Sequence, residues 1–154
     1  MNHENIVEIL LVEDNLRDAE LTIRALKRSN LANRVFHAVD GAEALDFLFG
    51  RGKYKRSSPV DEGTQIAVTP KVVLLDLKLP KVNGLEVLRS MKSDPRLHTI
   101  PVVIVTSSAE DPDIRAAYDL GANGYVIKPV QFDEFIEAMN KVGVYWLMVN
   151  HPLK

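Results

Sequence analysis

The sequence contains no cysteine, which excludes disulfide bonds, thiolate zinc sites and cysteine nucleophiles together. It also has almost no excess of charge of one sign, because 19 lysines and arginines stand against 21 acidic residues. A net charge of −2 gives no argument for nucleic-acid binding, and we expect no nucleic-acid partner. The absence of cysteine fits a reducing compartment, so we expect a cytoplasmic protein.

Long apolar runs are absent as well. The first apolar run, residues 6–12, is interrupted by Glu8 and followed by Glu13 and Asp14, so it fits neither a signal peptide nor a membrane span. We therefore expect no membrane partner. What is present is a chain of 154 residues, 46% of them apolar, which is the size and composition of one domain with its own core.

Four short runs rich in branched apolar residues indicate strands that are buried on both faces of a sheet. These runs are Ile9–Val12, Val72–Leu75, Val102–Val105 and Tyr125–Ile127, and a weaker candidate is residues 34–39. Between them lie apolar residues at helical spacing: Leu16, Ala19, Ile23 and Leu26; Ala42, Leu45 and Leu48; Leu85, Leu88 and Met91; Ile114, Ala117 and Tyr118; and Phe132, Phe135, Ile136, Met139 and Val142. The alternation predicts an α/β fold in which helices cover both faces of a parallel sheet.

Polar residues stand at the carboxyl ends of four predicted strands: Glu13 and Asp14, then Asp76, then Thr106, then Lys128. Each of them, taken alone, has an ordinary explanation as a helix cap or a turn residue. Parallel strands, however, end on one rim of the sheet, so these carboxylates and the ammonium would converge there. Clustered acids repel one another unless a cation joins them, and an all-oxygen cluster suits Mg²⁺. Such a site outlines phosphoryl transfer, in which a carboxylate can itself become an aspartyl phosphate.

The order and spacing of these motifs resemble the receiver domain of bacterial response regulators. The matching segments are Leu11–Asn15, Leu74–Pro80 with Gly84, Val105–Ser107, Gly121–Ala122 and Tyr125–Pro129. Several linked motifs at fixed spacing are a specific signal, and the match covers about residues 7–143. The resemblance implies a flavodoxin-like receiver fold, with a doubly wound five-stranded parallel sheet in the order 2-1-3-4-5. It also implies that residues 1–154 form a single receiver domain.

The resemblance implies a role for each acidic residue at the strand ends. Asp76 would accept a phosphoryl group from a phosphohistidine on a partner histidine kinase. Asp14, Asp76 and the main-chain carbonyl of Lys78 would bind Mg²⁺ directly, and Glu13 would hold the metal through water. The chain would then be a signalling switch that catalyses only its own phosphorylation and dephosphorylation, and not an enzyme acting on other molecules.

Three further residues take roles from the same resemblance. Lys128 would pair with the phosphoryl oxygens, and the peptide bond to Pro129 would be cis. Thr106 would donate its hydroxyl to a phosphoryl oxygen, and Tyr125 would be the aromatic switch residue that responds to this movement. The chain departs from the family pattern at Asn83, where many members have aspartate, but asparagine caps a helix equally well.

Residues 51–70 interrupt the alternation with a polar segment that begins with a basic cluster. It is either a solvated surface insertion or a docking segment. This insertion and the tail of residues 144–154 resemble the small response regulators that partner bacterial phytochrome histidine kinases. Since few residues follow the last predicted helix, we expect no output domain and signalling through protein contacts. The apolar run from Tyr145 to Val149, which includes Trp146, either folds back over the sheet edge of its own chain or forms an interface between two chains. We expect the interface, and therefore a homodimer.

Other classes of protein remain as alternatives. A magnesium-dependent phosphatase with an aspartate nucleophile would place a second aspartate where Lys78 stands. A nucleotide-binding enzyme would need a glycine-rich loop after the first strand, where residues 13–15 stand instead. A degenerate receiver used as a scaffold would usually lack Asp76 or Lys128, and both are present.

Overall fold

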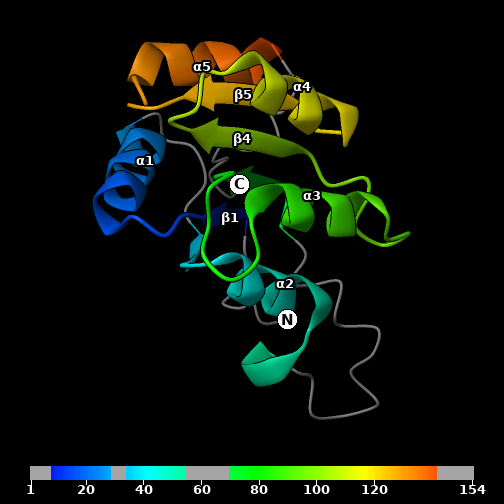
Figure 1. Ribbon diagram of the computed structural model, residues 1–154. Coiled ribbons are helices and arrows are strands. Elements are labelled where there is room, and N and C mark those ends of the chain that lie inside the picture. Colours follow the sequence, from blue (N-terminus) through cyan, green and yellow to red (C-terminus); the bar gives the residue numbers. More distant parts are fainter. Residues whose placement is uncertain (1–7, 29–33, 55–69, 142–154) are drawn as a thin grey trace, which may run out of the picture.

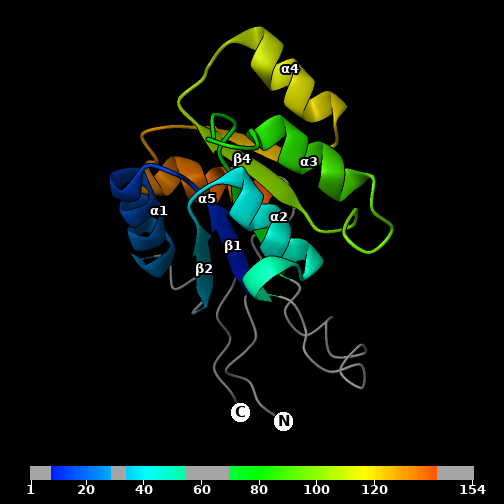
Figure 2. The same ribbon diagram turned by 60° about the horizontal axis from the view of Figure 1, so that its bottom comes forward.

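The computed structural model describes residues 8–28, 34–54 and 70–141. They form a five-stranded parallel sheet in the order β2-β1-β3-β4-β5 (Figures 1 and 2), which confirms the predicted fold class and strand order. The strands are β1 (Ile9–Val12), β2 (Val35–Ala38), β3 (Val72–Leu75), β4 (Val102–Thr106) and β5 (Gly124–Ile127). All residues of β1, β3 and β4 are buried, which explains their branched apolar composition.

Helices cover both faces of the sheet, as the alternation predicted. They are α1 (Leu16–Arg28), α2 (Gly41–Phe49), α3 (Gly84–Lys92), α4 (Asp111–Asp119) and α5 (Phe132–Lys141). Ala19 and Leu26 of α1 and Phe135 of α5 pack on one face of the sheet. The helices α2, α3 and α4 pack on the other face (Figure 2). No helix in the described part of the chain is long and apolar enough to cross a membrane.

Some of the apolar residues at helical spacing do not lie in the core. Leu16 is 69% exposed, because it is the first residue of α1 and lies beyond the carboxyl edge of the sheet. Tyr118 of α4 is 48% exposed, whereas Ala117 of the same predicted set is fully buried. On α2 the buried side chains include Ala44 and Phe47, whereas Ala42, Leu45 and Leu48 are only half-buried. This helix is apolar at most positions, so spacing alone did not select the stripe that meets the sheet.

The start of the predicted insertion packs against the domain. Gly52–Tyr54 form a short 3-10 helix, η2, directly after α2. The Tyr54 ring lies 5.5 Å from that of Phe36 and 5.4 Å from that of Phe47, and its hydroxyl donates a hydrogen bond of 2.7 Å to Glu43. The rest of the insertion, residues 55–69, and the predicted dimerising tail with Trp146 lie outside the described residues.

Candidate functional site

Glu13 and Asp14 follow β1 directly and lie on opposite sides of the chain. Glu13 is buried and Asp14 is exposed. One carboxylate oxygen of Glu13 accepts a hydrogen bond of 3.1 Å from the backbone N–H of Asn15. Its main-chain carbonyl accepts one of 2.7 Å from Nε2 of His37 on β2. The strand end is thus held in place by contacts to the next loop and to the neighbouring strand.

Asp76 follows β3 and is buried at the centre of the same rim. Its Oδ1 accepts a hydrogen bond of 3.3 Å from the backbone N–H of Lys78. The loop after it is closed by Gly84, whose N–H donates to the carbonyl of Leu77 at 2.8 Å. Asn83 caps α3, as expected from the sequence: its side-chain oxygen accepts a hydrogen bond of 3.1 Å from the N–H of Glu86.

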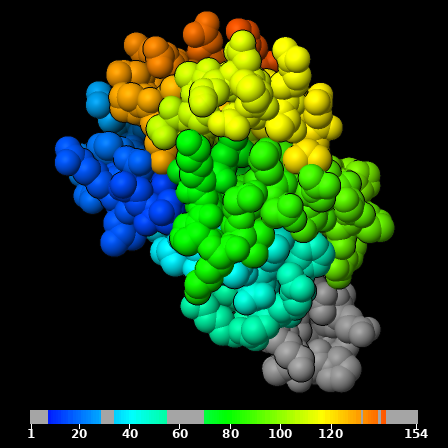
Figure 3. Space-filling view, in the orientation of Figure 1, coloured from blue at the N-terminus to red at the C-terminus, as the bar shows by residue number. Residues whose placement is uncertain are grey.

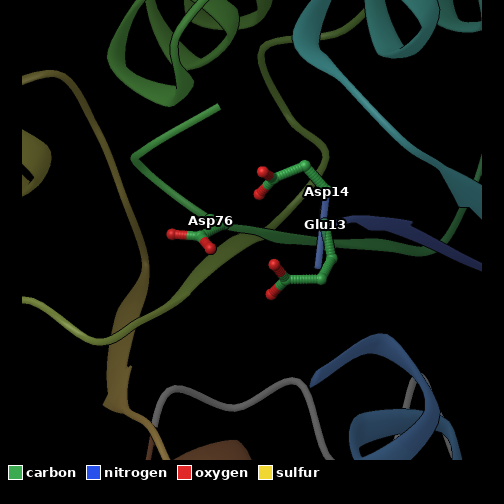
Figure 4. Close-up of side chains that lie close together, drawn as sticks. All are labelled: Glu13, Asp14 and Asp76. Carbon is green, nitrogen blue, oxygen red and sulfur yellow. The ribbon is translucent and has the colours of Figure 1, made fainter. Parts of the chain in front are cut away.

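The three carboxylates come together as predicted. Glu13, Asp14 and Asp76 each offer one oxygen, and these oxygens all lie within 4.8 Å of one another (Figure 4). An all-oxygen set with this spacing matches the donors that Mg²⁺ or Mn²⁺ prefers. Lys78, whose carbonyl was predicted as a further ligand, has an exposed side chain and lines an open cleft of about 410 Å³ together with Asp14.

Lys128, directly after β5, reaches the same place from the other side of β4. Its ammonium lies 2.6 Å from an oxygen of Glu13, 2.8 Å from one of Asp76 and 2.9 Å from one of Asp18. Burial lowers the pKa of Lys128, but hydrogen bonds to the three carboxylates outweigh burial and raise it overall. The ammonium therefore stays charged and balances part of the acidic cluster. The peptide bond between Lys128 and Pro129 is cis, as expected.

The buried carboxylate of Glu13 responds to the same environment. Burial raises its pKa to about 7, and the charge of Asp76 adds to this effect, whereas hydrogen bonds from Lys128 and the backbone of Asn15 oppose it. The raised pKa means that a charged Glu13 carboxylate is energetically unfavourable here unless cations lie close to it. A cation at this site therefore stabilises the charged form of Glu13.

Asp18 is a residue of this site that sequence reasoning missed. It lies in the first turn of α1, where an acidic residue has the ordinary explanation of complementing the helix dipole. The pair that it makes with Lys128 joins residues 110 positions apart. No local signal in the sequence marks such a contact.

Thr106 and Tyr125 lie beside the acidic cluster. Thr106 ends β4, and its hydroxyl is buried with no hydrogen-bond partner among the described residues. The half-buried Tyr125 on β5 donates its hydroxyl to the carbonyl of Ser108 at 2.9 Å, and its ring lies 6.4 Å from that of Tyr118. A buried hydroxyl without an acceptor is uncommon in proteins, and it fits a site that receives an oxygen-rich group.

Part of the site reaches the surface through the cleft that Asp14 and Lys78 line. In the space-filling view, the loop after β3 and helix α3 (green) lie beside α1 (dark blue) and below α4 (yellow) (Figure 3). The sheet order, the three carboxylates and the facing lysine together define the class: a receiver-type switch of two-component signalling. Residues 9–140 match the family model described as "Response regulator receiver domain". The chain therefore belongs to the response regulator receiver family.

Individual relatives agree with this assignment. The chain is 42% identical over 139 residues to "Probable methanogenesis regulatory protein FilR2" of Methanothrix harundinacea, covering 90% of this chain and 83% of that protein. It is 35% identical to the response regulator Rcp1 of Synechocystis, covering 90% and 88%. The solved bacteriophytochrome response regulator AtBRR is 49% identical, with a TM-score of 0.78 and coverage of 95% of this chain and 99% of that one. A Mn²⁺-bound form of Rcp1 has a TM-score of 0.72, with coverage of 96% and 99%.

Proposed function

We propose that this chain accepts a phosphoryl group on Asp76 from a partner histidine kinase, in the presence of Mg²⁺, and signals through protein contacts. The observation that carries the proposal is the position of the Asp76 carboxylate. It shares a cluster with oxygens of Glu13 and Asp14 and lies 2.8 Å from the ammonium of Lys128. A nucleophilic carboxylate between anionic metal ligands and a fixed cation is the arrangement that phosphoryl transfer requires.

In the proposed reaction an oxygen of Asp76 attacks the phosphorus of a phosphohistidine. The new O–P bond forms as the N–P bond breaks, and the imidazole nitrogen leaves with the electron pair of that bond. Lys128 stabilises the charge on the phosphoryl oxygens in the transition state. Thr106, whose hydroxyl has no partner among the described residues, donates to one of these oxygens and thereby gains an acceptor.

The acidic cluster supports the proposed metal site. Asp14, Asp76 and the carbonyl of Lys78 would hold Mg²⁺ directly, and Glu13 would hold it through water. A bound Mg²⁺ would supply positive charge that offsets the negative charge opposing the approach of a phosphate. The Mn²⁺-bound form of Rcp1 supports a divalent cation in a relative with this fold.

The proposed switch couples this site to β5. Movement of Thr106 toward a phosphoryl oxygen changes the space behind it, and Tyr125 then shifts between two rotamers. Only the conformation that binds the phosphoryl group better gains population. The hydrogen bond from Tyr125 to the carbonyl of Ser108 is the contact whose presence distinguishes the two rotamers.

We further propose a phytochrome-type histidine kinase as the partner, a cytoplasmic location, a single receiver domain over residues 1–154 and a homodimer. The partner rests on the likeness to AtBRR, a bacteriophytochrome response regulator that is 49% identical to this chain. The dimer rests on the apolar tail and on the exposure of Tyr118 and Ile127, which are 48% and 36% exposed on α4 and β5.

Intact-mass measurement after incubation with acetyl phosphate and Mg²⁺ tests the proposed acceptor. Wild type is expected to gain one phosphoryl group, and a chelator is expected to prevent this. Asp76→Asn removes the nucleophile and is expected to abolish the gain. Asp119→Asn, an exposed acid on α4, is the matched control and is expected to react like wild type. Phosphorylation of Asp76→Asn at the wild-type rate would show that the acceptor is another residue.

A further inference from the structure

The ammonium of Lys128 has three carboxylate partners, which come from three different elements. Glu13 and Asp76 follow strands and belong to the acidic cluster at the rim. Asp18 comes from the first turn of α1 and is not part of that cluster. Its carboxylate lies 2.9 Å from the ammonium, a distance typical of a charge-assisted hydrogen bond.

We propose that Asp18 is a positioning residue for Lys128, which holds the ammonium in place throughout the phosphorylation cycle. The inference rests on the proposed function of Asp76 and Lys128 and adds a residue to it. An ammonium has three N–H donors, and the three carboxylates near Lys128 provide one acceptor for each of them. Asp76 would lose its free carboxylate when it is phosphorylated, and Glu13 would also serve the proposed metal site. Of the three carboxylates, only that of Asp18 remains free to accept a hydrogen bond from Lys128 both before and after Asp76 is phosphorylated.

A fixed partner matters because lysine has a long and flexible stem. Without a fixed partner the ammonium can take many positions. Ordering it in the transition state then costs entropy and slows the reaction. With one donor held by Asp18, the other two N–H groups remain directed at the phosphoryl oxygens. A cation that is already in place when charge develops stabilises the transition state without reorganisation.

The structure also shows how Asp18 is itself held. Its backbone N–H donates to the side-chain oxygen of Asn15 at 3.0 Å, which caps the first turn of α1. The N–H of Asn15 in turn donates to Glu13 at 3.1 Å. The start of α1 is therefore tied to the acidic rim. The Asp18 side chain is 34% exposed, so it reaches the buried ammonium from the solvent side.

A competing explanation is that Asp18 only complements the dipole of α1. In that case its replacement would change helix stability but not the reaction. Glu20 provides the matched control, because it is an acid on the same helix whose ion pair with Arg24 is exposed on the surface. The two acids differ in whether they touch Lys128.

The test measures phosphorylation by acetyl phosphate at saturating Mg²⁺, over a range of donor concentrations. Asp18→Asn is expected to lower the maximal rate about tenfold, the effect of losing one charge-assisted hydrogen bond in the transition state. Glu20→Gln is expected to react like wild type. Asp18→Glu keeps the carboxylate and is expected to recover most of the rate. In a Lys128→Met background, Asp18→Asn is expected to have no further effect, because Asp18 acts through the ammonium.

The results separate the inference from the proposed function. If wild type and Asp76→Asn both fail to gain a phosphoryl group, the proposed function is wrong. If wild type reacts and Asp18→Asn reaches the same maximal rate, only the role of Asp18 is overturned. The role is also overturned if Asp18→Glu is as slow as Asp18→Asn, or if the loss persists in the Lys128→Met background.

Discussion

Gly84 decides how closely α3 can approach the loop that carries Asp76. A methyl group added at this position would lie 2.1 Å from the carbonyl oxygen of Asp76 and 2.6 Å from Cα of Leu77. Both are backbone atoms, so no side chain can rotate away. The glycine therefore allows the helix to begin directly against the proposed phosphoryl acceptor.

Gly84→Ala is accordingly expected to reduce the free energy of unfolding by about 3 kcal/mol or more, because the backbone must shift to relieve the overlap. Gly50→Ala is the comparison. Gly50 has a φ of 66°, but the nearest atom to an added methyl group lies 3.8 Å away. Its replacement is expected to cost about 1 kcal/mol. Urea unfolding of both variants measures the difference, and equal losses would contradict the steric explanation.

Lys78 is the residue expected to influence the lifetime of the phosphorylated state. Its side chain is exposed and lines the cleft with Asp14. A cation there can pair with the phosphoryl group or shield it from water. Lys78→Ala is expected to accelerate dephosphorylation by about fivefold at most, because an exposed ion pair contributes up to ~1 kcal/mol.

The lifetime is measured by the decay of the phosphorylated mass after removal of the donor. Lys71→Ala is the control, because Lys71 is also exposed but pairs with Glu8 before β1, at the opposite end of the strands. A decay rate for Lys78→Ala that equals those of wild type and Lys71→Ala would mean that the Lys78 side chain only faces solvent.

At the scale of elements, the start of α4 is stabilised by a residue outside the helix. The N-cap residue Glu110 makes no capping bond with its side chain. Ser108 instead ties the residues before the helix to its first turn: its hydroxyl donates to the Asp113 side chain at 2.5 Å and accepts from the N–H of Glu110 at 3.4 Å. The carbonyl of Ser108 also accepts from Tyr125, so these bonds connect α4 to the proposed switch residue.

Asp113→Ala is expected to lower the free energy of unfolding by about 1–2 kcal/mol, because it leaves the buried Ser108 hydroxyl without its acceptor. Asp111→Ala removes the same charge from the same helix turn and is expected to cost only about 0.5 kcal/mol through the helix dipole. Thermal or urea unfolding compares the two. In a Ser108→Ala background the effect of Asp113→Ala is expected to shrink, and an unchanged effect would rule out the pair.

At the scale of the whole molecule, the proposed dimer depends on the apolar tail after α5. Light scattering on the full chain is expected to show a dimer, and a chain that ends at Gly143 is expected to be monomeric. Tyr118→Ser, which removes an exposed aromatic ring from α4, is expected to weaken the dimer. Leu16→Ser is the control, because Leu16 is also apolar and exposed but lies on α1. A full chain that stays monomeric at high concentration, phosphorylated or not, would reject the dimer.

The pattern of apolar and polar residues was enough to predict the strands and the polar residues at the rim of the sheet. β1 and β3 have the predicted bounds, because a strand buried on both faces is apolar throughout and ends where polar residues begin. β4 extends one residue further, to Thr106, and the edge strand β5 begins one residue earlier, at Gly124. Parallel strands end on one rim, so the positions of Glu13, Asp14 and Asp76 along the chain were enough to predict that they meet. The strand order itself came from the family resemblance and was confirmed.

The contribution of the helices to that rim depends on tertiary packing. Whether Asp18 reaches Lys128, or whether Leu16 is buried, depends on how far α1 extends beyond the sheet and how it is rotated about its axis. The same holds for α2, whose apolar residues form adjacent stripes that are equally good as patterns. The physical reason is that helical spacing shows which residues share a face, but packing against the sheet decides which face is buried.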